Sequence, residues 1–205
     1  MYNHMCGAEK RRTEDYNHLS LALVENGSVK DCLEFFFRDE EEIECRCVVC
    51  NCTSASCRWT FYSLPRYLVL QLKRFKLSAK LKLRKQLNSV KIDRKLQLRL
   101  PGQSDLTQED IINKTMDTDL TSTEYRKAEE RTDRHEVDQC ASYSLISVLN
   151  HYGSTIHSGH YTCDCFNQTD HLWLSYDDDE VSLTTEEYIL NKRQKSAYVL
   201  IYELL

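Results

Sequence analysis

Hydrophobic and polar positions alternate in four segments of the second half of the chain, which is the pattern of half-buried β-strands. The segments are "SYSLISVLNHYG" (142–153), "GHYTCDCF" (159–166), "HLWLSYDD" (171–178) and "SAYVLIYEL" (196–204). The short connections between the first three favour antiparallel pairing. A short helix or turn is expected near "TTEEYIL" (184–190), before the last strand.

In the first half of the chain, the hydrophobic pattern predicts one helix and two further strands. Between Ser28 and Glu44, apolar residues recur at helical spacing behind a serine that can cap the first turn. "SLPRYLVLQLKRF" (Ser63–Phe75) is rich in leucine and valine and predicts a central strand, whereas "VKIDRKLQLRL" (Val90–Leu100) alternates and predicts a half-exposed one. The fold class is therefore α+β, dominated by antiparallel sheet.

The segment from 101 to 141 follows neither pattern. It is rich in Asp, Thr, Glu and Lys, with helical periodicity only in "TEYRKAEERTDRH". Such a segment buries too little apolar surface to offset its ordering entropy. We expect an inserted, largely disordered or marginally helical stretch that divides two structured parts.

Composition narrows the class of protein further. The chain is 41% hydrophobic and 29% charged, with a formal net charge of −5, so it has no overall basic field for nucleic acid. The basic stretch Leu72–Lys85 reads as solvated strands and loop, or as a contact for an acidic partner. Residues 1–12 lack the apolar region of a signal peptide, and "YLVLQL" is too short to span a bilayer. We expect an intracellular protein of cytoplasm or nucleus, with reduced or metal-bound cysteines.

The end of the second strand pattern contains candidate chemistry. If the turn occupies Asn167–Asp170 and Phe166 pairs with His171, His160 lies directly opposite Asp177. Opposed Cβ atoms in an antiparallel pair are about 4.5–5.5 Å apart on one face. A carboxylate there can fix the histidine tautomer and stabilise its protonated form. The alternatives are an ordinary surface pair and a solvated acidic turn, and a catalytic pair also needs a nucleophile.

Six motifs together resemble the C-terminal half of a ubiquitin-specific protease catalytic domain, and are most similar to the branch of ubiquitin-specific proteases 26, 29 and 37. They are "YSLISVLNHYGSTIHSGHYTC", "WLSYDDDEV", "AYVLIYEL", "LPRYLVLQLKRF", "NHLSLAL" and "DCLEFFFRDEEEIECRCVVC". The resemblance implies a papain-like cysteine protease fold of thumb, palm and fingers, here without the thumb. It divides the chain into a fingers-like segment with a cysteine cluster (1–62), palm strands (63–100), the polar insert (101–141) and palm with the histidine box (142–205).

The resemblance also implies roles for individual residues. His160 matches the general base, Asp177 the acid that orients it, and Asp178 a second acid. The implied reaction is hydrolysis of the isopeptide bond after the last glycine of ubiquitin, through an acyl-enzyme. The residues expected near the ubiquitin tail are Gly159, Tyr161 and Trp173.

The family's nucleophile lies in a Gly-Asn-x-Cys-Tyr box, and none of the ten cysteines here has that context. Cys163 and Cys165 are odd numbers of residues from His160 and should face away from it. We expect the nucleophile to come from an upstream thumb segment of the same parent chain, and predict that these 205 residues are inactive alone. The alternatives are a ubiquitin-binding module without chemistry and a decayed remnant.

The chemistry itself needs no cofactor, but the resemblance raises a structural zinc site on the fingers. Zinc-binding members hold the metal with two Cys-x-x-Cys pairs. Cys47 and Cys50 match one pair, whereas Asn3 and Cys6 stand where the other is expected. Three thiolates need a fourth ligand, for which Cys45, Cys52 and His4 remain open.

Overall fold

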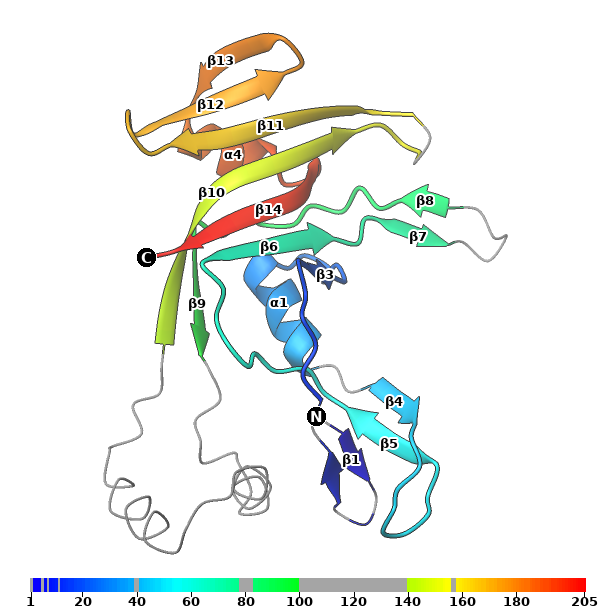
Figure 1. The fold of residues 1–205 in the computed structure, drawn as a ribbon. Coiled ribbons are helices and arrows are strands. Elements are labelled where there is room, and N and C mark those ends of the chain that lie inside the picture. Colours follow the sequence, from blue (N-terminus) through cyan, green and yellow to red (C-terminus); the bar gives the residue numbers. More distant parts are fainter. Residues whose placement is uncertain are drawn as a thin grey trace, which may run out of the picture.

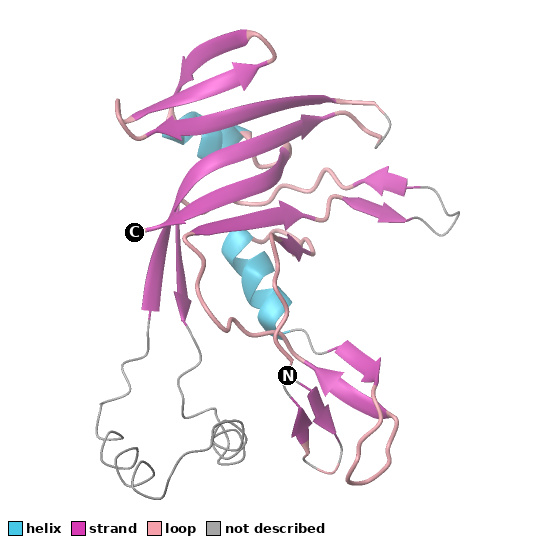
Figure 2. Ribbon diagram, viewed as in Figure 1, coloured by secondary structure: helices cyan, strands magenta, loops and turns pink. Residues whose placement is uncertain are grey.

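The computed structural model describes residues 2–4, 6, 8–10, 12–38, 41–77, 83–99, 140–155 and 158–205. The elements lie in three sheets and two helices (Figures 1 and 2). In chain order they are β1 (Tyr2–His4), β2 (Glu9–Lys10), β3 (Leu19–Leu21), α1 (Val29–Arg38), β4 (Glu41–Glu44), β5 (Ser54–Cys57), β6 (Tyr67–Leu72), β7 (Phe75–Leu77), β8 (Leu83–Lys85), β9 (Lys95–Arg99), β10 (Cys140–Tyr152), β11 (His160–Asn167), β12 (Leu172–Asp177), β13 (Glu180–Thr184), α4 (Glu186–Lys192) and β14 (Ala197–Leu204).

An eight-stranded sheet forms the body of the protein. Its order is β13-β12-β11-β10-β14-β6-β3, and β9 pairs with the first residues of β10 beside this path. All pairings in it are antiparallel except that of β3 with β6. A four-stranded sheet of order β2-β1-β5-β4 lies apart from it, beyond the far end of α1 (Figure 1). Neither described helix is long and apolar enough to cross a membrane.

Helix α1 begins as the sequence predicts and ends earlier. The Ser28 hydroxyl accepts a hydrogen bond from the Asp31 N–H at 3.1 Å, and the Asp31 carboxylate accepts from the Ser28 N–H at 2.7 Å. This reciprocal cap satisfies two N-terminal donors. The predicted extension to Glu44 is wrong, because Glu41–Glu44 form β4 and pair with β5. The apolar spacing stops at Phe37, so the following acidic residues offer no face to pack.

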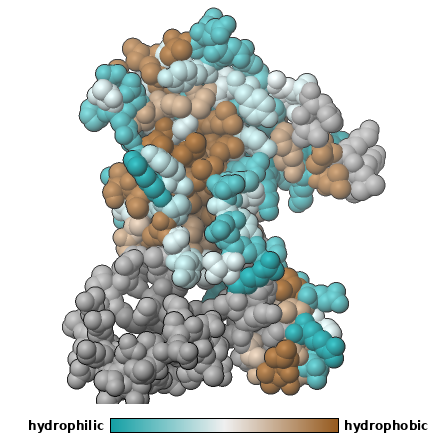
Figure 3. All heavy atoms as spheres, in the orientation of Figure 1, coloured by the Kyte–Doolittle hydropathy of each residue, from teal (hydrophilic) through white to brown (hydrophobic). Residues whose placement is uncertain are grey.

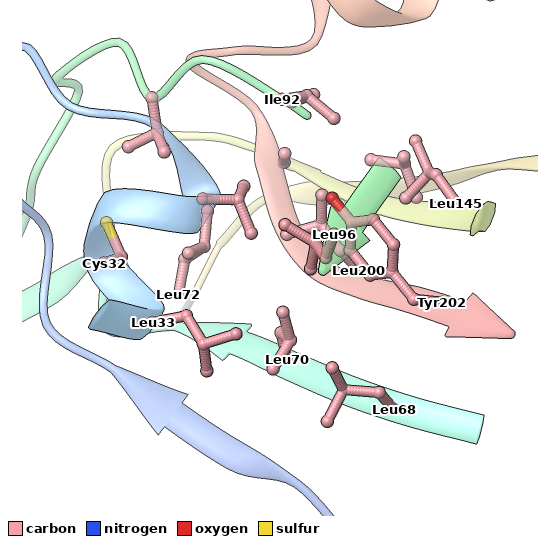
Figure 4. Packing of buried hydrophobic residues seen from close by; sticks show 14 of the residues in the cluster. Cys32, Leu33, Leu68, Leu70, Leu72, Ile92, Leu96, Leu145, Leu200 and Tyr202 are labelled. Carbon is pink, nitrogen blue, oxygen red and sulfur yellow. The ribbon is translucent and has the colours of Figure 1, made fainter. Parts of the chain in front are cut away.

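The hydrophobic core lies between α1 and one face of the large sheet. Leu68, Leu70 and Leu72 of β6 point toward this core, and Leu200 and Tyr202 of the neighbouring β14 continue it (Figure 4). The residues between them point to the opposite face and are only half-buried, namely Val69, Gln71, Val199 and Ile201. We call this opposite side the open face. Hydrophobic residues also gather over the middle strands of the large sheet in Figure 3.

A buried arginine joins two chain segments beside this sheet, one at Asn88 and one at Gln194–Ala197, where β14 begins. Arg74 has no exposed surface, and its guanidinium donates to the carbonyls of Ala197 (2.6 Å), Asn88 (2.8 Å) and Gln194 (2.6 Å). Burial lowers its pKa to about 10, which leaves it charged at neutral pH. In the sequence, Arg74 stands in a basic stretch and near the end of the predicted strand Ser63–Phe75, and charge alone does not reveal which arginine is buried.

The four strands predicted for the second half are present, and α4 occupies the expected helix or turn. β13 was not predicted, because its side chains are mostly exposed and alternate weakly. The predicted strand from Val90 is regular only from Lys95, although Val90 and Ile92 are buried in the core. The predicted insert lies almost wholly outside the described residues, but Cys140 and Ala141, assigned to it, belong to β10.

Candidate functional site

His160 and Asp177 form a hydrogen-bonded pair at the end of the large sheet. His160 is the first residue of β11 and Asp177 the last of β12, and the His160 Nε2 atom contacts Asp177 Oδ1. About half of each side chain is exposed, at 47% and 55%. The hydrogen bond to Asp177, then its charge, and to a lesser degree the charge of Asp178, raise the pKa of His160 above the ordinary value. The pair therefore stabilises the protonated imidazole that a general base forms.

The register that predicted this pair is wrong by two residues. Phe166 pairs with Trp173 and not with His171, which belongs to the loop and has φ 54°. Asn167 still pairs with Leu172, and its side-chain Oδ1 accepts the N–H of Thr169 at 2.9 Å, so the loop of residues 168–171 has the expected four residues but begins one residue later. A shift of two preserves which residues share a face. His160 therefore still meets Asp177, diagonally and not directly opposite.

Asp178 lies beside the pair in a tight turn. Asp177 pairs with Glu180, which leaves Asp178 and Asp179 as the two-residue connection between β12 and β13. Asp178 has φ 49°, the left-handed conformation that such hairpin turns require. One ligand atom each of His160, Asp177 and Asp178 lies within 4.8 Å of the others. The acidic turn and the histidine partner, which the sequence left as alternatives, occur together, because Asp177 contacts His160 while Asp178 and Asp179 form the turn.

The backbone before His160 is pressed against a second histidine. A Cβ atom at Gly159 would lie 2.1 Å from His151 Nε2 and 2.5 Å from the Tyr152 carbonyl oxygen, so only glycine fits. His151 is 2% exposed, and its ring centroid is 4.7 Å from that of Tyr161. Burial, and secondarily the charge of Lys85, lower the pKa of His151. The buried, neutral His151 ring therefore packs against the backbone directly before His160.

Trp173 does not belong to this site. It is 4% exposed and packs in the core against Phe166, with ring centroids 5.5 Å apart. Phe166 is six residues from His160 along β11, which corresponds to about 20 Å of strand. The expectation that Trp173 lies near the ubiquitin tail is therefore wrong. Gly159 and Tyr161, in contrast, flank His160, and Tyr161 is half exposed.

A buried ion pair, not foreseen from the sequence, supports the strands of the site. Asp164 of β11 has no exposed surface, and Arg193 after α4 contacts both its oxygens, at 2.8 and 3.0 Å. Asn150 of β10 donates to the same carboxylate at 2.7 Å, and Arg193 also reaches Ser175 of β12 at 3.4 Å. The Asp164–Arg193 pair therefore joins β10, β11, β12 and the end of α4. The alternation in "CDCF" does not reveal this ion pair, because in the sequence an aspartate that points inward cannot be told from a polar residue that points to solvent.

No thiol stands with His160 among the described residues. The group formed there contains Asp177 and Asp178 but none of the cysteines, all ten of which are described. Cys163 and Cys165 pair across the sheet with Leu149 and Ser147, whose side chains lie on the open face. The expectation that they turn away from His160 is confirmed by this register.

A second cluster brings together the three cysteines proposed as zinc ligands. One sulfur each of Cys6, Cys47 and Cys50 lies within 4.8 Å of the others, and the Cys6–Cys47 sulfur distance is 3.6 Å. Sulfurs bound to one tetrahedral zinc at 2.3 Å lie about 3.8 Å apart, so the three fit a metal. Hydrogen bonds from backbone N–H groups, chiefly that of Cys50, lower the pKa of Cys47 to about 6. Among the candidates for a fourth ligand, Cys52 places its sulfur 3.0 Å from that of Cys50 but lies outside the group of three, so it would have to shift to complete a tetrahedral site.

Residues 13–202 match the family model described as ubiquitin carboxyl-terminal hydrolase. Among curated proteins, ubiquitin hydrolase B of Dictyostelium discoideum is 30% identical over 190 residues, which cover 92% of this chain and 34% of the relative. Human ubiquitin carboxyl-terminal hydrolase 26 is 32% identical over 117 residues, covering 57% and 12%, and the mouse hydrolase 37 is 37% identical over 87 residues, covering 41% and 9%. The chain thus spans about a third or less of these relatives.

Solved structures agree on the fold. The Ubp8-containing deubiquitinating module of yeast SAGA with a Sgf73 mutant superposes with a TM-score of 0.69 at 22% identity, covering 100% of this chain and 39% of the other. A second structure of the module, bound to ubiquitin aldehyde, gives 0.70 at 22% identity, covering 100% and 40%. The predicted papain-like fold of the ubiquitin-specific protease type, mostly antiparallel sheet, is confirmed.

Proposed function

This chain belongs to the ubiquitin carboxyl-terminal hydrolase family, and from that membership we propose that it is the part of a deubiquitinase catalytic domain that binds ubiquitin and supplies the base and the acid of the triad. The observation that carries the proposal is the His160–Asp177 hydrogen bond beside Asp178. The solved relative bound to ubiquitin aldehyde supports ubiquitin as the partner.

In this proposal each group has a step, which the geometry of the site supports. Asp177 occupies Nε2 of His160, which leaves Nδ1 free to accept the proton of a thiol and later to return it to the leaving amine. The raised pKa favours the imidazolium formed in the first step. A ubiquitin tail would pass the residues that flank His160, which are Gly159 and Tyr161. The thiol would come from a thumb segment carrying the Gly-Asn-x-Cys-Tyr box.

A second candidate is ubiquitin binding without hydrolysis. It is favoured by one observation: none of the ten cysteines belongs to the group around His160. In that case the pair would remain as a structural contact at the end of the sheet, and the palm would act as a recognition surface only. The two candidates share the partner and differ in whether a nucleophile reaches His160.

A two-stage experiment separates these candidates. The isolated chain is first titrated into isotopically labelled ubiquitin, where we expect shifts concentrated on its C-terminal tail. A ubiquitin C-terminal electrophile should form no covalent adduct with any of its cysteines. A thumb segment with the cysteine box is then fused ahead of Met1, and cleavage of a fluorogenic ubiquitin amide is measured.

In the fusion, His160→Ala should lower kcat by about 10²- to 10⁴-fold, as expected for loss of a general base. Asp170→Asn is the matched control, because Asp170 lies in the turn of the same hairpin and bonds Asn167, not His160. Tail binding without hydrolysis by the folded fusion would favour the second candidate. An absence of ubiquitin binding at high concentration would overturn both.

For the fingers-like segment we also propose a structural zinc held by Cys6, Cys47 and Cys50, with Cys52 as the fourth ligand. A metal there would join the loop before β5, which carries Cys47 and Cys50, to the N-terminal strands β1 and β2, which flank Cys6. Cobalt titration tests this, because tetrahedral thiolate coordination gives intense visible bands. We expect one equivalent to bind, and Cys47→Ser and Cys52→Ser to weaken it, whereas Cys140→Ser should not. Equal cobalt spectra for Cys47→Ser and the parent chain would refute the assignment.

A further inference from the structure

Two cysteines outside both sites lie with their sulfur atoms in contact. Cys163 and Cys165 alternate with Asp164 on β11, and their sulfurs are 3.4 Å apart. The Ser147 hydroxyl, on the neighbouring strand β10, lies 3.3 Å from each of them. The two thiols and the hydroxyl therefore lie together at one point of the sheet. The catalytic proposal uses none of them, because they face away from His160.

The pair is accessible from the open face. Both cysteines are partly exposed, and the neighbours of Cys163 and Cys165 on β12 are Tyr176 and Leu174. The two thiols also differ in acidity. The hydrogen bond from Cys163, helped by Ser147, lowers the pKa of Cys165 to about 6, whereas the same contact and burial raise that of Cys163. Near neutral pH, Cys165 is therefore the thiolate of the pair and Cys163 the protonated thiol.

We propose that Cys163 and Cys165 form a peroxide-sensitive dithiol, a modification site that closes to an intrastrand disulfide. The Cys165 thiolate attacks hydrogen peroxide, so that an S–O bond forms and the O–O bond breaks. Cys165 becomes a sulfenic acid, and the hydroxide that leaves takes up a proton from solvent as water. The Cys163 thiol then attacks that sulfur, so that the S–S bond forms, the S–O bond breaks and a second water leaves. Two electrons pass from the two thiols to one peroxide, and the Ser147 hydroxyl can relay the proton lost by Cys163.

Closing this bond should shorten the strand. Residues two apart in an extended strand have Cα atoms about 6.6 Å apart, whereas most disulfides prefer about 5.5–6 Å. The shortening falls on Asp164, whose buried carboxylate fixes Arg193 and Asn150. His160 begins the same strand, so the oxidised form should displace it relative to Asp177. A strained disulfide is also easily reduced, which makes the modification reversible.

The test uses the reduced chain and one equivalent of hydrogen peroxide, followed by alkylation and peptide mass spectrometry. We expect a peptide containing both cysteines that has lost two hydrogens and becomes alkylated only after dithiothreitol. In Cys163→Ser, dimedone should label Cys165 at least about tenfold more than in the parent chain, because the thiol that consumes the sulfenic acid is gone. Histidine NMR of the parent chain should show the His160 signals move on oxidation and return on reduction.

Cys140, exposed at the start of β10, reports general oxidation in the same sample. Oxidation of Cys140 ahead of the pair would overturn the proposal, as would dimedone labelling of Cys165 that is equal in the parent and Cys163→Ser. Disulfides joining Cys163 or Cys165 to any other cysteine would overturn it as well. An intrastrand disulfide with unchanged His160 signals would refute the coupling to the histidine. These readouts do not depend on ubiquitin or on catalytic activity.

Discussion

Replacing Arg193 by methionine removes the guanidinium that neutralises Asp164 and keeps most of the side-chain volume. Two hydrogen bonds to a carboxylate with no exposed surface disappear, and Asn150 alone remains as its partner. Breaking a buried ion pair from one side costs about 3–5 kcal/mol, because the remaining charge stays buried without compensation. Arg193 itself is 13% exposed at its side chain, so water can only partly replace it.

For a domain of this size, a loss of about 1 kcal/mol lowers Tm by about 2–4 °C, so Arg193→Met should lower it by about 6–20 °C. Urea denaturation followed by far-UV circular dichroism measures the free energy directly, with an unchanged m-value as the sign that the comparison is valid. The matched control is Arg66→Met, whose ion pair with Glu203 at 3.2 Å leaves 75% of the arginine exposed. It should lose less than about 1 kcal/mol.

The double variant Asp164→Asn with Arg193→Met tests the reason for the loss. If the cost comes from an uncompensated charge, removing that charge should return a substantial part of the stability lost in Arg193→Met. The reasoning would be refuted if Arg193→Met lost no more than Arg66→Met. It would also fail if the double variant were less stable than Arg193→Met, because packing and not charge would then dominate.

Three further predictions concern the site and its support. Asp177→Asn should return the pKa of His160 toward its ordinary value, which NMR titration measures. Because the folded-state pKa of His160 is raised, the pair stabilises the fold below about pH 6.5, and this stabilisation is lost as pH rises through the raised pKa. The variant should therefore be most destabilised, relative to the parent chain, at acid pH. Gly159→Ala should lose about 1–3 kcal/mol in urea denaturation and move the His160 signals, because its Cβ would overlap His151; unchanged signals would contradict this. Arg74→Met should lose about 3–5 kcal/mol by the same assay, because it leaves buried carbonyls without donors, and a loss below 1 kcal/mol would contradict that.

What the sequence predicts well is whatever depends on local periodicity. The four strands of the second half follow from alternation, and the His160–Asp177 pair survives a wrong register because a shift of two keeps both on one face. The error itself came from His171, whose left-handed conformation places it in the loop. The position of a hairpin loop along the chain depends on backbone angles that residue type only biases.

What the sequence does not predict depends on partners distant in the chain. The aspartate between Cys163 and Cys165 reads as an outward polar residue until Arg193, 29 residues away, is placed beneath it. Trp173 was assigned to the site through its place in a motif, although its neighbours make it part of the core. β4 begins where the apolar spacing of α1 ends, and its strand conformation depends on pairing with β5. Tertiary contacts override local propensity in each case.

The position of β14 in the sheet has a consequence for the order of folding. β14 lies between β10 and β6, although it follows every other described strand in the chain. The meander from β10 to β13 can form early through short connections, whereas pairing of β6 with β14 joins residues such as Leu70 and Leu200. Until β14 is synthesised, β6 and β10 each present an unpaired edge. The nascent protein therefore passes through a stage with two open sheet edges, in which chaperone binding or aggregation competes with completion of the sheet.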